Sequence, residues 1–153
     1  YLLSLNALMV VLFQFPITIW VKKHKPILMM ALGNLLYAIG LSMYGYVTSY
    51  LLFVLAVIIF TLGEMVNAPV VQSMAANMAP KDMRGRYMAV FMIGRGTALA
   101  VGPVIAGMIL DNYNPRWVWL GGGMILCMVA VLYLILNSIA GARYESVSSS
   151  IPD

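Results

Sequence analysis

Residues 50–110 read YLLFVLAVIIFTLGEMVNAPVVQSMAANMAPKDMRGRYMAVFMIGRGTALAVGPVIAGMIL, and this stretch decides the fold. It contains two apolar runs of helical length, joined by a polar and basic turn at residues 80–86. Glu64 lies in the first run and Arg95 in the second. A charged side chain is costly inside a hydrophobic span, so each of these two residues is a candidate for a functional role.

The composition of the whole chain indicates a membrane protein. Hydrophobic residues make up 63% of the 153 residues, charged residues make up 9%, and the mean hydropathy is +0.93. Soluble domains carry about 25% charged residues, so this chain has too few to cover a water-facing surface. The net charge of +4 is no sign of nucleic-acid binding, because the charges lie in short clusters between apolar runs.

Five segments are long and apolar enough to cross a bilayer, which takes about 20 helical residues. We predict an all-α transmembrane protein with spans at about residues 2–21, 26–47, 50–79, 87–110 and 117–136. The polar, serine-rich segment 141–153 is expected to be a disordered cytoplasmic tail. Because Tyr1 already lies in an apolar run, we interpret the chain as part of a longer polypeptide, whose N-terminal remainder would be its partner in the bilayer.

Basic residues between the spans predict the orientation in the cell membrane. One side carries seven of them and the other side carries only Arg116. The seven are Lys22, Lys23, Lys25, Lys81, Arg84, Arg86 and Arg143. Loops rich in Lys and Arg stay in the cytoplasm, so the loops at 22–25 and 80–86 and the C-terminus are expected there.

Glu64 is the candidate for proton or cation coupling. It lies near the middle of its span, where an ionised carboxylate is costly unless it is paired, hydrated or protonated. A carboxyl group that changes its protonation near neutral pH is what a proton-coupled pump needs. The alternative is a structural carboxyl group that is protonated or hydrogen-bonded to a neighbouring helix.

Arg95 is expected to lie at a different depth from Glu64. If the two runs turn around residues 80–86, Arg95 lies level with Gln72, and Glu64 lies level with Gly102. The eight residues between these levels correspond to about 12 Å of helix, so we predict two distinct sites rather than an ion pair. Arg95 would extend toward water, bind an anionic group, or bond the freed carbonyls of a bent helix.

Further polar residues define a candidate substrate cavity. Asn67 and Gln72 lie on or near the helical face of Glu64 at 100° per residue. Asn6 and Gln14 share a face of the first span, either for hydrogen bonds between helices or as a cavity wall. The candidate cavity residues are therefore Asn6, Gln14, Asn67, Gln72 and Arg95.

Small residues of the fourth span predict close helix packing. Ala98, Gly102 and Ala106 recur every four residues, and Pro103 and Gly107 accompany them. This spacing lets membrane helices touch backbone to backbone, so Gly102, Pro103 and Gly107 are candidates for helix packing and gating.

No motif in the chain supports an enzyme. Serines within the spans have no histidine partner, so no nucleophile triad is supported. Cys127 is the one cysteine, which excludes an internal disulfide and a cysteine-based metal site. The glycines flanking Arg95 do not complete a phosphate-binding loop. We expect no catalysis, no cofactor and no metal.

The segment PKDMRGRYMAVF at 80–91, followed by GPVIAG at 102–107, resembles the major facilitator superfamily, most of all its bacterial drug- and solute-efflux branch. The resemblance implies a twelve-helix transporter of which these are helices 8–12, with Arg84 and Arg86 in a cytoplasmic loop. It also implies that the first, third and fourth spans line a central cavity and that the second and fifth face lipid.

The resemblance implies a secondary transporter that exports small organic solutes or drugs in exchange for protons. One alternative is proton-coupled uptake of a sugar or metabolite by the same fold. The other is a membrane-embedded enzyme or scaffold whose chemistry lies in the missing part.

Overall fold

Five helices make up the computed structural model, which describes residues 2–80 and 82–148. They are α1 (Leu2–Val21), α2 (Pro26–Met43), α3 (Tyr50–Met78), α4 (Arg84–Asn112) and α5 (Arg116–Ser148). Each has an apolar window long enough to cross a membrane, and in α5 this window is Arg116–Ile139. The predicted all-α, five-span architecture is confirmed. Lys81 of the predicted turn lies outside the described residues.

The helix ends differ from the predicted spans by three residues or more at three places, and by one or two residues at three others. α2 stops at Met43 rather than at residue 47, because the next turn tightens, with the N–H of Tyr44 donating to the carbonyl of Leu41. α4 starts at Arg84, so Arg84 and Arg86 lie in its first turn rather than in a loop.

The third difference is that α5 continues to Ser148, where a disordered tail was predicted from residue 141. The added residues include alanine, arginine and glutamate, which favour helix, and no proline interrupts the segment before Pro152. Residues 149–153 of the predicted tail lie outside the described part.

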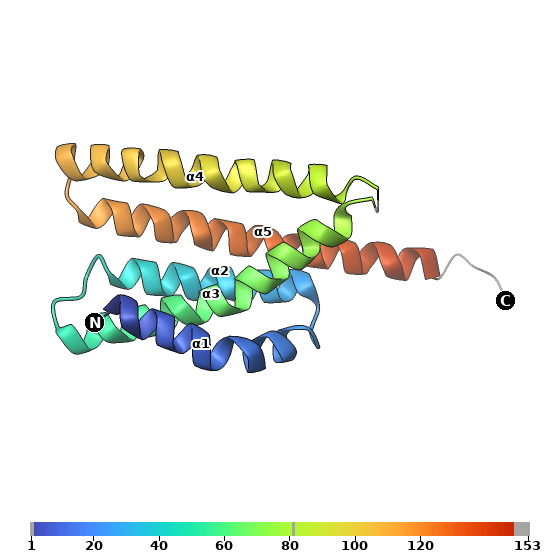
Figure 1. Ribbon diagram of the computed structural model, residues 1–153, viewed down its shortest axis with the longest axis horizontal. Coiled ribbons are helices and arrows are strands. Elements are labelled where there is room, and N and C mark those ends of the chain that lie inside the picture. Colours follow the sequence, from blue (N-terminus) through green and yellow to red (C-terminus); the bar gives the residue numbers. More distant parts are fainter. Residues whose placement is uncertain (1, 81, 149–153) are drawn as a thin grey trace.

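The helices run alternately in opposite directions, so their connections gather at two ends of the bundle (Figure 1). The α1–α2 and α3–α4 connections and the C-terminal end of α5 lie at one end. The basic loop at 22–25 and the start of α4 are therefore on the same side of the molecule. The α2–α3 and α4–α5 connections lie at the other end.

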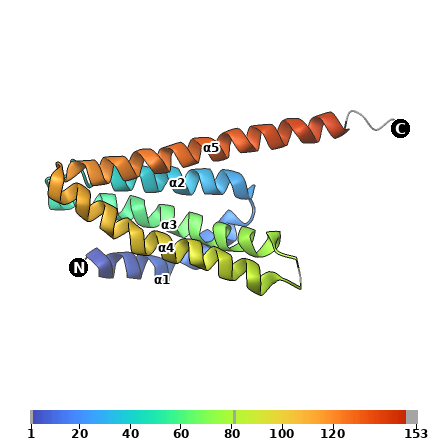
Figure 2. The same ribbon diagram turned by 90° about the horizontal axis from the view of Figure 1, so that it is seen from above.

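Helix α2 is the centre of the bundle and packs against both α3 and α5 (Figure 2). α1 packs on α3, whereas α4 makes only sparse contacts with α3 and α5. Of the apolar windows, that of α2 is the most enclosed, with 39% of its residues buried, against 0% for α4. α2 therefore has helices on two sides, while Leu35 and Ile39 remain 43% and 44% exposed, so the expectation that the second span also faces lipid stays a prediction.

Close helix packing occurs in α2, α3 and α5 rather than along the predicted ladder of α4. A Cβ atom at Gly40 would lie 2.7 Å from the backbone nitrogen of Phe60, and one at Gly63 would lie 2.8 Å from that of Tyr37. In contrast, a Cβ atom at Gly102 or Gly107 would meet no atom within 4 Å in the described part of the chain. The packing role predicted for these two glycines has no partner helix among the five.

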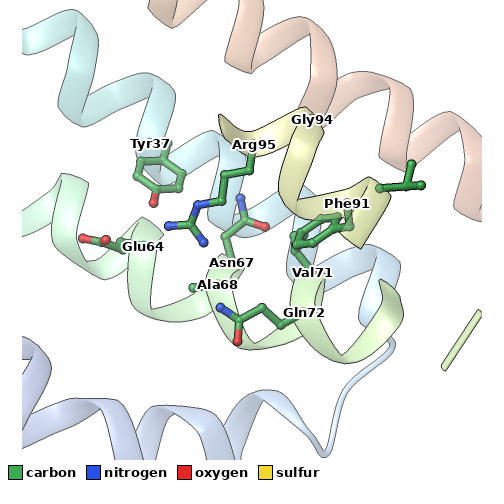
Figure 3. A pocket seen from close by; sticks show the side chains of 10 residues that line it. Tyr37, Glu64, Asn67, Ala68, Val71, Gln72, Phe91, Gly94 and Arg95 are labelled. Carbon is green, nitrogen blue, oxygen red and sulfur yellow. The ribbon is translucent and has the colours of Figure 1, made fainter. Parts of the chain in front are cut away.

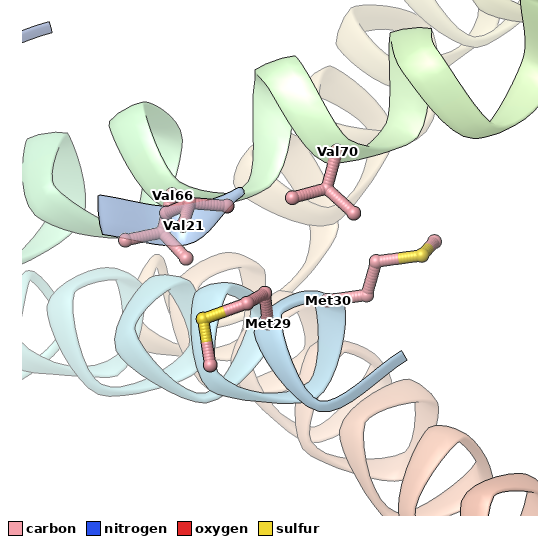
Figure 4. Close-up of a cluster of buried hydrophobic side chains, with 5 residues drawn as sticks. All are labelled: Val21, Met29, Met30, Val66 and Val70. Carbon is pink, nitrogen blue, oxygen red and sulfur yellow. The ribbon is translucent and has the colours of Figure 1, made fainter. Parts of the chain in front are cut away.

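The hydrophobic core lies where α1, α2 and α3 meet near the basic end (Figure 4). Its buried members are Val21, Met29, Met30, Val66 and Val70. Two of the five are methionines, whose unbranched side chains fill irregular gaps between helices. This packing fixes α3 against α1 and α2 and leaves the side of α3 that faces α4 open.

Candidate functional site

A cavity of about 560 Å³ lies between α2, α3 and α4 (Figure 3). Ligand sites in proteins commonly measure about 300–1,000 Å³, so the cavity has the size of a small-molecule site. It has both apolar walls and polar side chains. Its lining residues are Tyr37, Glu64, Asn67, Ala68, Val71, Gln72, Val90, Phe91, Gly94 and Arg95.

Arg95 enters the cavity from α4, and its guanidinium group points between Tyr37 and Asn67 toward α3 (Figure 3). No ion pair of 4.0 Å or less joins Arg95 to Glu64, and the Arg95 side chain has no hydrogen bond to any described residue. α4 is held loosely here, because the glycines on either side of Arg95 have no atom of another helix near them among the described residues. The cavity therefore contains a cation whose partner is not supplied by these five helices.

Glu64 lines the same cavity from α3 and is connected to α1 on its other side. Asn6 Nδ2 donates to Glu64 Oε2 at 3.2 Å and to Thr61 Oγ1 at 2.9 Å. Thr61 is fully buried, one turn before Glu64, so α1 and α3 share a polar contact inside the apolar bundle. This contact holds one oxygen of the carboxyl group and leaves the other without a hydrogen bond from the described residues.

Gln14 satisfies a carbonyl group that Pro69 leaves free. Proline has no N–H, so the helical bond from residue 69 to the carbonyl of Met65 is missing in α3. Gln14 Nε2 donates to this carbonyl oxygen at 3.2 Å and to Thr18 Oγ1 at 3.0 Å. A side chain of α1 thus replaces the lost bond at Met65, the residue directly after Glu64.

Asn67 lies between the cavity and α2. Gly33 makes room for it, since a Cβ atom at Gly33 would lie 2.8 Å from the Asn67 Cβ. Asn67 Oδ1 is buried and has no hydrogen-bond partner in the described part of the chain. An unpaired buried acceptor is costly, so Asn67 is a polar group of this site with bonding capacity left.

The structure brings four of the predicted site residues to one cavity, namely Glu64, Asn67, Gln72 and Arg95. Glu64 and Arg95 line this one cavity and form no ion pair of 4.0 Å or less, as expected, whereas their action as two sites along a transport path stays a prediction. Counting residues along the helices places backbone atoms, and it neglects how far an arginine side chain reaches. The two residues share a cavity without forming a direct ion pair.

Asn6 and Gln14 do not line this cavity. Two roles were considered for them, a cavity wall and hydrogen bonds between helices. The structure shows the second, because both side chains donate hydrogen bonds to α3. Gly102, Pro103 and Gly107 lie along α4 away from the cavity lining, and Arg84 and Arg86 are exposed at its start.

Sequence reasoning missed Tyr37, Thr61 and Phe91. Tyr37 was hidden because the second span was assigned to lipid, although its hydroxyl group is polar and near the middle of that span. Thr61 lies three residues before Glu64 and therefore on the same helical face, which was a usable signal. Nothing in the pattern of α4 distinguishes Phe91 from its apolar neighbours.

Comparison with known proteins agrees with this arrangement of apolar spans around a polar cavity. Residues 1–148 match the Major Facilitator Superfamily. The chain belongs to this transporter family. No solved structure gives a significant match.

Individual relatives within the superfamily share about a quarter of their aligned residues with the chain. It is 28% identical over 139 residues to the uncharacterized MFS-type transporter YttB of Bacillus subtilis, covering 90% of this chain and 33% of that protein. It is also 28% identical over 139 residues to a Na(+), Li(+), K(+)/H(+) antiporter of Planococcus maritimus, covering 91% of this chain and 29% of that protein.

A third relative is the uncharacterized MFS-type transporter YdeE of Escherichia coli, which is 27% identical over 135 residues, covering 86% of this chain and 33% of that protein. The chain spans about a third of the length of the curated relatives it matches.

Proposed function

We propose that these spans belong to a proton-coupled secondary transporter that exports small organic solutes, with Glu64 as the group that exchanges the proton. The observation that carries this proposal is a carboxyl group inside the bundle that faces a cavity of small-molecule size. Ionisable residues within membrane spans commonly mark substrate or proton pathways. Membership of the superfamily supports transport, and the polar residues around Glu64 support a hydrated path to it.

Glu64 meets two requirements of such a coupling group. Asn6 donates to one of its oxygen atoms, and the other oxygen atom has no hydrogen bond from the described residues and can take up a proton without breaking that bond. Glu64 also faces the cavity, so a substrate there is close enough to compete with the proton. Competition between substrate and proton for one carboxylate links the inward movement of protons to the outward movement of the solute.

A second candidate function is exchange of monovalent cations for protons, and one relative bears the name Na(+), Li(+), K(+)/H(+) antiporter. Glu64 and the Thr61 hydroxyl group supply oxygen atoms one helical turn apart, and oxygen is the ligand atom that hard cations take. In this case a metal cation rather than an organic solute would displace the proton.

Transport in proteoliposomes tests both candidates. The complete polypeptide is reconstituted with a pH dye trapped inside, the vesicle interior is made acidic, and ethidium, phenylalanine, NaCl, LiCl or KCl is added outside. We expect at least one of the two organic solutes to enter while protons leave, because antiport moves solute and protons in opposite directions. Glu64→Gln should abolish this proton release, since an amide binds no exchangeable proton.

The outcomes separate the alternatives. Proton release with the alkali salts but with neither organic solute favours cation exchange. Accumulation driven only by an acidic exterior indicates symport and therefore uptake. If the imposed gradient moves none of these solutes and Glu64→Gln changes nothing, the coupling role of Glu64 is refuted. The variant Asp111→Asn is the matched control, since it removes a carboxylate that is exposed at the end of α4.

A further inference from the structure

The two charged residues of the cavity lie on different helices and are not satisfied by each other. Arg95 comes from α4 and Glu64 from α3, and no ion pair of 4.0 Å or less joins them in the described structure. Asn6 bonds one oxygen of Glu64 from the side of α1, whereas no described residue bonds the guanidinium group. The cavity therefore presents one positive and one negative group to whatever occupies it.

Apart from its two charged residues, the cavity lining is largely apolar. A bound ligand must therefore compensate both charges. Ala68, Val71, Val90 and Phe91 contribute no polar side-chain group. In such surroundings a charge that loses water and gains no partner is strongly disfavoured. A ligand with only a cationic group would leave Arg95 uncompensated, and a ligand with only an anionic group would leave Glu64 uncompensated.

We propose that the cavity binds a small zwitterionic organic solute, with its anionic group on Arg95 and its cationic group on Glu64. This inference rests on the proposed function, because it names the class of substrate at that same cavity. The planar guanidinium group offers paired N–H donors that match a carboxylate. Asn67 and Gln72 add neutral hydrogen-bonding groups beside the two charges.

The apolar part of the solute would lie against the aromatic rings of Tyr37 and Phe91. These rings come from α2 and α4 and both line the cavity, with Tyr37 beside the guanidinium group and Phe91 on the far side of Asn67 (Figure 3). A volume of about 560 Å³ leaves room for a side chain in addition to the two charged groups. The expected solute therefore resembles a free amino acid with a hydrophobic side chain.

Binding of matched compounds to the complete polypeptide in detergent tests the inference without any pH gradient. Phenylalanine, phenethylamine and 3-phenylpropionate share one ring and differ only in which charged groups they carry. Leucine, isoamylamine and 4-methylpentanoate form a parallel aliphatic series. Calorimetric titration should show each amino acid binding at least about tenfold more tightly than its amine or its acid, because truncating one partner of a desolvated charge pair loses at least that much affinity.

Variants of Arg95 and Glu64 test which charged group of the solute each residue binds. Arg95→Gln should lower the affinity for phenylalanine to that for phenethylamine, and Glu64→Gln should lower it to that for 3-phenylpropionate. Arg95→Lys keeps the charge and should retain most of the preference. Arg116→Gln, the same change at an exposed arginine outside the cavity, should have no effect. Thermal unfolding of each variant shows whether it is folded.

Three results would overturn the inference. The first is that neither series prefers the zwitterion over its amine and its acid. The second is that the amines bind as tightly as the amino acids. The third is that phenylalanine binds more tightly when Arg95→Gln and Glu64→Gln are combined, which would indicate that Arg95 and Glu64 pair with each other. Proton-coupled movement of ethidium or alkali cations without a zwitterion preference refutes this inference alone. Tight zwitterion binding without gradient-driven transport refutes the coupling proposal and leaves the substrate class intact.

Discussion

Single glycines set how closely α2 approaches its neighbours. At Gly40 the nearest atoms to an added Cβ belong to the backbone and Cβ of Phe60, at 2.7–2.8 Å, and these atoms cannot move unless the helices separate. Real Cβ atoms essentially never approach so closely. Close contact of this kind is a main source of helix association in membranes, where lipid is as apolar as the side chains. Gly40 is therefore a structural residue of the α2–α3 pair.

Gly40→Ala is expected to destabilise the bundle. Alanine favours helix over glycine by about 1 kcal/mol, but overpacking at a close contact costs about 1–3 kcal/mol. Gly121→Ala carries the same gain in helix propensity, and its Cβ would meet no described atom within 4 Å. Thermal unfolding in detergent should give a lower midpoint for Gly40→Ala than for Gly121→Ala. Equal midpoints would mean that α2 and α3 do not pack as closely as described.

The residue scale also shows how far sequence reasoning reached into the site. Glu64, Asn67 and Gln72 were predictable because they break an apolar run, and Asn67 and Gln72 lie near the helical face of Glu64 on either side of it. That they share a cavity with Arg95 was not predictable, because this depends on the length of the arginine side chain and on how two different helices pack. Tyr37 was missed for the same reason, since which side of α2 is enclosed depends on its neighbours.

At the scale of the helix, the bend of α3 and the polar residues of α1 form one unit. Pro69 removes a hydrogen bond in α3, and Gln14 restores a donor to the freed carbonyl of Met65 at 3.2 Å. The three residues come from two helices and lie near the core cluster at Val66 and Val70. The sequence pattern predicted the polar face of α1, but the connection of Gln14 to Pro69 is a tertiary contact.

A double-mutant cycle tests this unit. Gln14→Leu should lower stability by about 1 kcal/mol, which is the range measured for hydrogen bonds between membrane helices. In a Pro69→Ala background the same change should cost much less, because the restored N–H satisfies the Met65 carbonyl from within α3. Unfolding titrations of the four proteins give the coupling energy. A coupling near zero would show that Gln14 acts independently of Pro69.

At the scale of the whole molecule, length and hydropathy predicted the five helices well, because each span must satisfy its backbone within itself in lipid. The central place of α2 could not be predicted in this way, because apolar residues face lipid and protein alike. For the same reason the small residues of α4 predicted close packing, yet a Cβ atom at Gly102 or Gly107 would meet no atom within 4 Å in the described structure.

The fold gathers the 22–25 loop and the basic start of α4 at one end, and from the positive-inside rule we predict that this end is cytoplasmic. Single cysteines introduced at His24, Asp82 and Asn114 in a Cys127→Ala background test this orientation in intact cells. A maleimide that does not cross membranes should label only the cysteine that replaces Asn114. After the cells are opened, it should label all three. The fold places His24 and Asp82 at the same end of the molecule. Labelling of these two positions from outside would therefore show that the protein is inserted in the opposite orientation, and the proposed direction of transport would be reversed.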